Sequence, residues 1–114
     1  MGLDQTAYTK NKEGVNIIIQ DWRKHNALDG WMEALWRVKG NDGYWGGSEL
    51  ELEMNDIKQL EAVVVNDDLP ENCRFFFGRD SRFSKEKKKE TLKFISNAYD
   101  TLRGGNKVFY SSWF

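Results

Sequence analysis

The stretch Ser48–Met54 reads Ser-Glu-Leu-Glu-Leu-Glu-Met, a strict alternation of acidic and apolar side chains. Successive side chains of a β-strand point to opposite faces, so Leu50, Leu52 and Met54 should share one face and the glutamates the other. This pattern predicts a strand at Glu49–Glu53 that covers a core with its apolar residues and exposes its acids to solvent.

Outward from this strand, the chain alternates between strand-like and helix-like segments. The predicted strands are Leu3–Thr9, Val15–Ile19, Glu49–Glu53, Arg74–Gly78 and Val108–Phe114. The predicted helices are Trp22–Lys39 with Asp21 as its N-cap, a second one capped by Asn55, and Ser84–Arg103. The order β-β-α-β-α-β-α-β predicts an α+β fold, with a mixed β-sheet and three amphipathic helices packed mainly on one face.

The apolar positions of these segments define the expected core. They recur at helical spacing in the helices and at alternate positions in the strands. The predicted core residues are Leu28, Trp31, Met32, Leu35, Leu50, Leu52, Leu60, Val64, Phe76, Leu92, Ile95 and Tyr99.

The length and composition of the chain indicate which broad class of protein it belongs to. The chain has 114 residues, 39% of them hydrophobic, which suits a single domain over residues 1–114. One cysteine excludes an internal disulfide and fits a reducing compartment. Apolar runs fall short of the roughly 20 residues that cross a bilayer, so we expect no membrane association. The N-terminal residues lack the apolar segment of a signal peptide.

Charge is distributed unevenly along the chain, although its formal sum is only −1. Residues 41–72 contain nine acids and one base, a net of −8, whereas residues 73–93 contain eight bases and three acids, a net of +5. One interpretation is a pair of solvated faces that attract each other. The other is a basic patch for an anionic partner, but the overall charge disfavours nucleic acid.

Polar and aromatic residues cluster around position 25. Trp22, His25 and Asp29 are spaced to share one edge of the predicted helix, while Arg23 and Asn26 could bind a carboxylate, a phosphate or a base edge. These residues either form a recognition edge or hold the helix to a neighbouring strand. With one histidine in the chain, a multi-histidine metal site is excluded. We expect no catalytic residues, metal or cofactor.

Four short motifs carry a family resemblance. They are MGLD at residues 1–4, WRKHNALDGW at 22–31, FFFG at 75–78 and SSW at 111–113. In this order the chain resembles a family of small proteins of uncharacterised activity that bacteriophages and prophages encode. It departs from the family pattern at Asp21, His25, Asp29 and Arg79. The resemblance implies a phage origin and a location in the cytoplasm of the infected bacterial host cell, but no activity.

Together these features predict a small phage accessory protein that is not an enzyme and acts by binding a host or phage protein. One alternative is binding of a small molecule such as a nucleotide or another anion, and a further one is nucleic-acid binding. We expect the start of the first helix to meet the C-terminal or FFFG segment. The predicted binding residues are Trp22, Arg23, His25, Asn26, Phe77, Ser111, Ser112 and Trp113.

Overall fold

The computed structural model describes residues 3–66 and 84–113. The strands are β1 (Asp4–Lys10), β2 (Asn16–Arg23), β3 (Leu50–Leu52) and β4 (Val108–Trp113), and the helices are α1 (Asn26–Val38), α2 (Met54–Val65) and α3 (Ser84–Arg103). This is the α+β class predicted from the sequence. The predicted strand at Arg74–Gly78, with Phe76, lies outside the described residues.

The four strands form one sheet in the order β2-β1-β4-β3, so β1 and β4 are its central strands. All three pairings between the described strands are antiparallel, so this part of the sheet is antiparallel and not mixed as predicted. A single helix between two strands would allow them to run parallel. Two helices, α2 and α3, separate β3 from β4, and these two neighbouring strands run in opposite directions.

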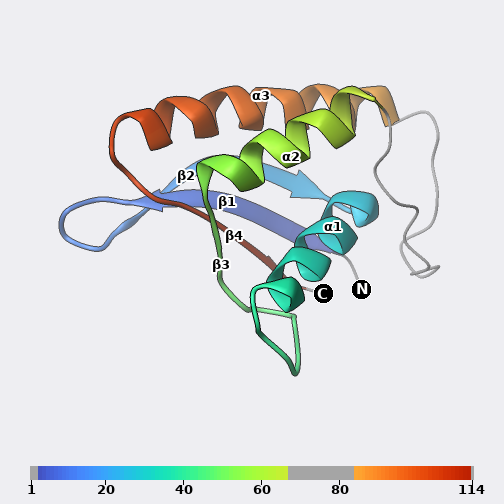
Figure 1. Cartoon of the computed structure of the whole chain (residues 1–114), viewed down its shortest axis with the longest axis horizontal. Coiled ribbons are helices and arrows are strands. Elements are labelled where there is room, and N and C mark those ends of the chain that lie inside the picture. Colours follow the sequence, from blue (N-terminus) through green and yellow to red (C-terminus); the bar gives the residue numbers. More distant parts are fainter. Residues whose placement is uncertain (1–2, 67–83, 114) are drawn as a thin grey trace.

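The helices lie on one face of the sheet, as expected, with α2 and α3 side by side above it (Figure 1). Leu50 and Leu52 of β3 are almost fully buried beneath them. Glu49, Glu51 and Glu53 are exposed, which confirms the two faces predicted from the alternating stretch.

Helix α1 begins at Asn26, four residues later than predicted. Trp22 and Arg23 instead extend β2, where they are the partners of Gln5 and Asp4 in β1. Lys24 ends the strand because it adopts a left-handed backbone conformation with φ 58°. The apolar spacing of the helix begins at Leu28, and the earlier start was predicted because Asp21 was taken as the N-cap.

Two predicted N-caps were also wrong. Asp21 lies in β2 and accepts a hydrogen bond from Thr6 across the strand pair at 3.0 Å. Helix α2 begins at Met54, with Glu53 rather than Asn55 as its N-cap. The main-chain N–H of Glu53 donates to the Asp56 carboxylate at 2.9 Å, which satisfies one of the groups left unpaired at the helix start.

The core matches most of the residues predicted for it. Fully or nearly fully buried are Leu28, Met32, Leu50, Leu52, Leu60, Val64 and Ile95, while Trp31, Leu35, Leu92 and Tyr99 are partly buried and pack against them. The prediction missed several large members of this core: Trp22, Trp36, Trp45, Phe94 and Tyr110.

Removal of the last strand should unfold the chain. β4 lies between β1 and β3, and it contributes the buried residues Val108 and Tyr110. Deletion of residues 108–114 should therefore abolish the cooperative thermal transition measured by circular dichroism. Trp113→Ala, which shortens a largely exposed side chain of the same strand, is the matched control and should still melt cooperatively. A deletion variant that melts like the full chain would contradict this role of β4.

Candidate functional site

The face of the sheet opposite the helices brings together residues from both ends of the chain. In the register of the central strands, Asp4 lies between Arg23 and Trp113. Gln5, next to Asp4, is buried, so side chains alternate and Asp4 belongs to the opposite face. Three strands thus place an arginine, an aspartate and a tryptophan in one row across this open face.

The next row toward the hairpin turn is polar. Thr6 lies between Asp21 and Ser111, and its hydroxyl donates to Asp21. Beyond this row the face is occupied by contacts within the chain itself. Tyr8 stacks on Phe109 with ring centroids 5.6 Å apart, and the Lys10 ammonium lies 4.7 Å from the same ring.

The row with Trp113 is open to solvent. Trp113 is 66% exposed although it belongs to a paired strand. Arg23 and Asp4 form an ion pair at 3.2 Å, and both side chains are largely exposed. An exposed ion pair adds little stability, so both side chains remain able to exchange partners.

Two consecutive glycines of the loop 41–49 hold aromatic rings in this region. A Cβ at Gly47 would lie 2.6 Å from the Trp113 ring, and one at Gly46 would lie 2.7 Å from Tyr44. Gly47 also has φ +79°, and its N–H donates to the Ser112 carbonyl at 2.7 Å. The Trp113 ring therefore rests on main chain that only glycine allows. We call Asp4, Arg23, Tyr44, Ser111 and Trp113 the Trp113 surface.

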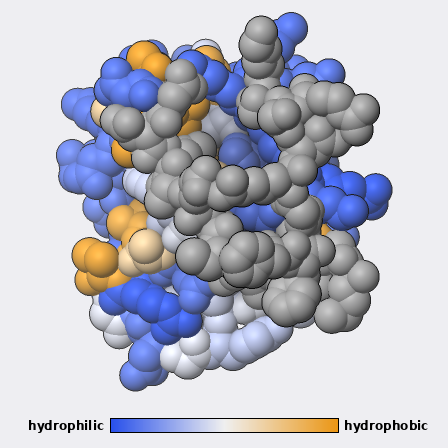
Figure 2. Space-filling view, turned by 90° about the vertical axis from the view of Figure 1, so that its right-hand side faces the viewer, coloured by the Kyte–Doolittle hydropathy of each residue, from blue (hydrophilic) through white to orange (hydrophobic). Residues whose placement is uncertain are grey.

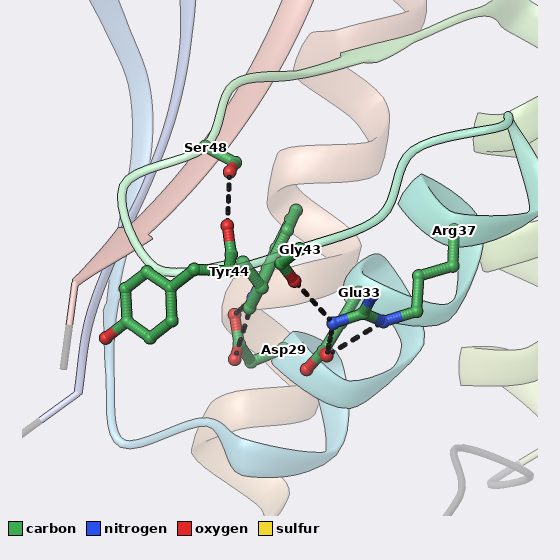
Figure 3. Close-up of polar contacts among 7 residues, drawn as sticks. Asp29, Glu33, Arg37, Gly43, Tyr44 and Ser48 are labelled. Atoms are coloured by element: carbon green, nitrogen blue, oxygen red, sulfur yellow. Dashed lines mark hydrogen bonds and ion pairs between the residues drawn. The ribbon is translucent and has the colours of Figure 1, made fainter.

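The same loop is tied to α1 (Figure 3). Arg37 donates to the Gly43 carbonyl at 3.1 Å and forms an ion pair with Glu33 at 2.8 Å. The Trp45 indole N–H donates to both carboxylate oxygens of Asp29, at 3.1 and 3.2 Å. Helix α1 thus determines where the loop lies.

Asp29 is fully buried, and it is the acceptor at the centre of an internal network. The Tyr110 hydroxyl donates to it at 2.9 Å and accepts from the Gln5 amide at 2.8 Å. Burial raises the pKa of Tyr110 well above its ordinary value, and the nearby Asp29 carboxylate adds to the shift. The phenol therefore stays protonated and continues to donate to Asp29.

Gln5 connects this network to the start of α1. Its amide nitrogen also donates to the main-chain carbonyl of His25 at 3.0 Å, and its amide oxygen accepts from the His25 N–H at 2.8 Å. On the other side, the Trp22 indole N–H donates to Thr91 of α3 at 3.1 Å. These buried side chains have hydrogen-bond partners inside the protein, as is usual for polar residues whose role is structural.

The His25 imidazole is buried as well, and its Nε2 has no hydrogen-bond partner in the described part of the chain. Burial, and secondarily the charge of Lys87, lowers the pKa of His25 from 6.5 to about 4. A neutral, enclosed imidazole is unsuited to general acid–base catalysis near neutral pH.

A pocket opens beside Trp22 and Arg23. Its lining contains the carboxylates of Asp4, Asp21 and Glu90 and one guanidinium, that of Arg23. Three carboxylates thus outnumber the one guanidinium in this lining, and the Lys87 ammonium lies beside it, 3.0 Å from the Arg23 carbonyl.

The structure thus separates the residues predicted as one site. Arg23, Ser111 and Trp113 belong to the open face, whereas Trp22, His25 and Ser112 are buried. Asn26 is half-buried at the start of α1, and Phe77 lies outside the described residues. Sequence reasoning missed Asp4 and Tyr44. The alignment of β1 with β2 and β4 brings Asp4 to the site. This alignment cannot be read from a local sequence pattern.

Viewed from the side on which α1 lies in Figure 1, the described residues are mostly hydrophilic, with apolar residues in small groups (Figure 2). Scattered exposed apolar residues are normal for a protein surface. No helix in residues 3–66 or 84–113 has the length and hydropathy needed to cross a membrane. No protein-family model, curated protein or solved structure matches the chain.

The buried imidazole makes stability depend on pH. The unfolded chain binds a proton at His25 near pH 6.5 and the folded chain only near pH 4. The stabilisation is therefore complete above pH 6.5 and is lost as the pH falls toward 4. The shift of about 2.5 pH units corresponds to roughly 3 kcal/mol.

Urea unfolding between pH 4 and 7 measures this loss. Carboxylates titrate in the same range, so His25→Gln, which keeps the main-chain bonds to Gln5, is the reference. The wild type should lose more free energy of unfolding than the variant across this range. Parallel curves would show that His25 titrates alike in the folded and unfolded chains.

Proposed function

We propose that this chain is an accessory protein that binds another protein, of the phage or its bacterial host, through the Trp113 surface and without catalysis. The phage setting, and with it the cytoplasm of an infected cell, rests on the family resemblance of the four sequence motifs. The choice of surface rests on the exposure and the support of Trp113.

Trp113 carries the proposal. Tryptophan, tyrosine and arginine are enriched among the residues that dominate binding energy at interfaces. Here Trp113 is 66% exposed, Tyr44 is 78% exposed, and Arg23 lies in the same row. A large apolar side chain left in water on a regular strand gains free energy when a partner covers it.

The Trp113 ring is also held in place before any partner binds. Trp113 lies in a strand paired with β1, and its ring rests on Gly47. The loop that holds Gly47 is tied to α1 through Trp45 and Arg37. Because these side chains are already positioned, little conformational entropy is lost on binding.

The electrostatics favour a protein partner over a nucleotide or another small anion. The pocket beside Trp22 and Arg23 is lined by three carboxylates and one guanidinium. Among the lysines of α3, Lys87 donates to the main-chain carbonyl of Arg23 at 3.0 Å and so contributes to the scaffold. A partner with a basic residue beside an apolar pocket would complement Asp4, Asp21 and Trp113.

Affinity capture from infected bacterial lysate, followed by titration with the purified partner, tests this function. Trp113→Ala and Arg23→Ala should each weaken binding about tenfold or more, as expected for side chains at the centre of an interface. Their melting temperatures should stay close to that of the wild type, because both side chains are exposed.

Val38→Ala is the matched control, since Val38 is 83% exposed on α1 and does not belong to the Trp113 surface. It should bind like the wild type. A partner that binds Trp113→Ala as tightly as the wild type would exclude this surface. Binding of a nucleotide or nucleic acid that Trp113→Ala leaves unchanged would favour the other functions considered from the sequence.

A further inference from the structure

Among the described residues, the outer side of β2 is the long edge of the sheet that no further strand pairs with. β2 has eight residues and lies at one side, while the opposite edge strand, β3, has three. Main-chain groups that point outward from an edge strand lack a strand partner. At the Arg23 end, the Lys87 side chain covers this edge by donating to the Arg23 carbonyl. This contact leaves the half of β2 near the hairpin turn uncovered.

The hydrogen bonds of the hairpin show which residues of this half point outward. The Asn11 N–H donates to the Val15 carbonyl at 3.0 Å, so this opposed pair is a bonded one. Bonded and non-bonded pairs alternate along antiparallel strands. Asn16 and Ile18, which oppose Lys10 and Tyr8, therefore direct their N–H and C=O groups away from β1.

The alternation ends just beyond Ile18. Tyr8 pairs with Ile18 and Ala7 with Gln20, so Ile19 is the extra residue of a β-bulge. A strand added to this edge can consequently use two outward residues, Asn16 and Ile18, before the bulge interrupts the ladder.

The side chains of this half are apolar and exposed. Val15, Ile17 and Ile18 are 57%, 49% and 61% exposed. Residues 14–20 contain no charged residue and no proline. Folded proteins usually protect free edges with lysine, proline or a covering element, and uncharged β-branched edges readily pair with another strand.

We infer that this edge pairs with the same edge of a second copy of the chain, antiparallel, in a dimer whose two-fold axis passes through Ile17. In this register Asn16 of each copy opposes Ile18 of the other, so both outward residues of both copies form hydrogen bonds. A register centred on Asn16 would place Ile18 opposite Gly14 in the turn. One centred on Ile18 would place Asn16 opposite Gln20, past the bulge.

A second copy of the chain matches this edge because its own edge is also uncharged and because the two copies can be related by a two-fold axis. It brings an uncharged strip against an uncharged strip, so no charge is buried. A two-fold contact uses the same patch on both copies and closes, which prevents growth into a fibre. The strip is short, so the dimer should be weaker than those with stable interfaces, which bury roughly 1,200 Å² or more. The dimer should therefore form at micromolar concentrations or above.

Analytical ultracentrifugation from micromolar to millimolar concentration tests the dimer. The wild type should shift from monomer to dimer. Ile18→Lys should stay monomeric over the same range, because it places a charge on the pairing edge while its exposed position leaves the fold intact. Val38→Lys makes the same charge change on α1 and should dimerise like the wild type.

Disulfide trapping tests the register. The main-chain groups of Ile17 face β1, so the two Ile17 residues would form a non-bonded pair about 4.5 Å apart at Cα, within reach of a disulfide. On a Cys73→Ser background, oxidised Ile17→Cys should form a covalent dimer and Val38→Cys should not.

Several outcomes would overturn this inference. They are a wild type that remains monomeric at millimolar concentration, assemblies larger than a dimer, and dimerisation of Ile18→Lys equal to that of the wild type. The Trp113 surface is separate from this edge, so failure of the dimer would leave the proposed protein binding untouched, and the reverse also holds.

Discussion

The fold depends on one buried carboxylate, which must receive its hydrogen bonds from other groups of the chain because it is shielded from water. Asp29 is fully buried, and Trp45 and Tyr110 donate to it from a loop and from a central strand. Removing one partner from a buried charge typically costs several kcal/mol, so these three residues fix one another. Through them α1, the loop 41–49 and β4 acquire a single relative arrangement. Gln5 extends this arrangement to β1 and to the start of α1.

This internal network decides which residues are available for binding. Because Gln5 and Tyr110 face the helices, their neighbours along β1 and β4 face solvent. Asp4, Ser111 and Trp113 thus reach the open face, and the loop held by Asp29 places Gly47 beneath the Trp113 ring. The polar cluster in the interior is scaffold, and the chemistry offered to a partner lies on the opposite side of the same sheet.

Sequence patterns predicted those features that arise from local periodicity. The alternation around Leu50 identified β3 and its exposed acids, and helical spacing identified most of the core. The predicted beginning of α1 was wrong because Asp21 was taken as an N-cap, while the pairing of Trp22 with Gln5 and of Arg23 with Asp4 in β1 holds these residues in a strand. Long-range pairing of this kind overrides local preference.

The same limit applies to the candidate site. Trp22, Arg23 and His25 are close in sequence, yet strand alternation and the turn at Lys24 send Arg23 to solvent and the other two inward. Asp29 was considered as a partner of His25, but its actual partners are 16 and 81 residues distant. Contacts at such separations depend on how the strands are aligned in the sheet, and this alignment cannot be read from a single sequence.

The most direct test of this account is the free energy of unfolding of Tyr110→Phe, with Tyr44→Phe as its control. Each variant removes one hydroxyl, from a phenol that is fully buried at Tyr110 and 78% exposed at Tyr44. Loss of the Tyr110 hydroxyl removes one hydrogen-bond donor to the buried Asp29 and one acceptor of the Gln5 amide, so we predict a loss of about 1–3 kcal/mol. The control should change by less than about 0.5 kcal/mol. Equal, small effects of both variants would contradict the central role of the buried network.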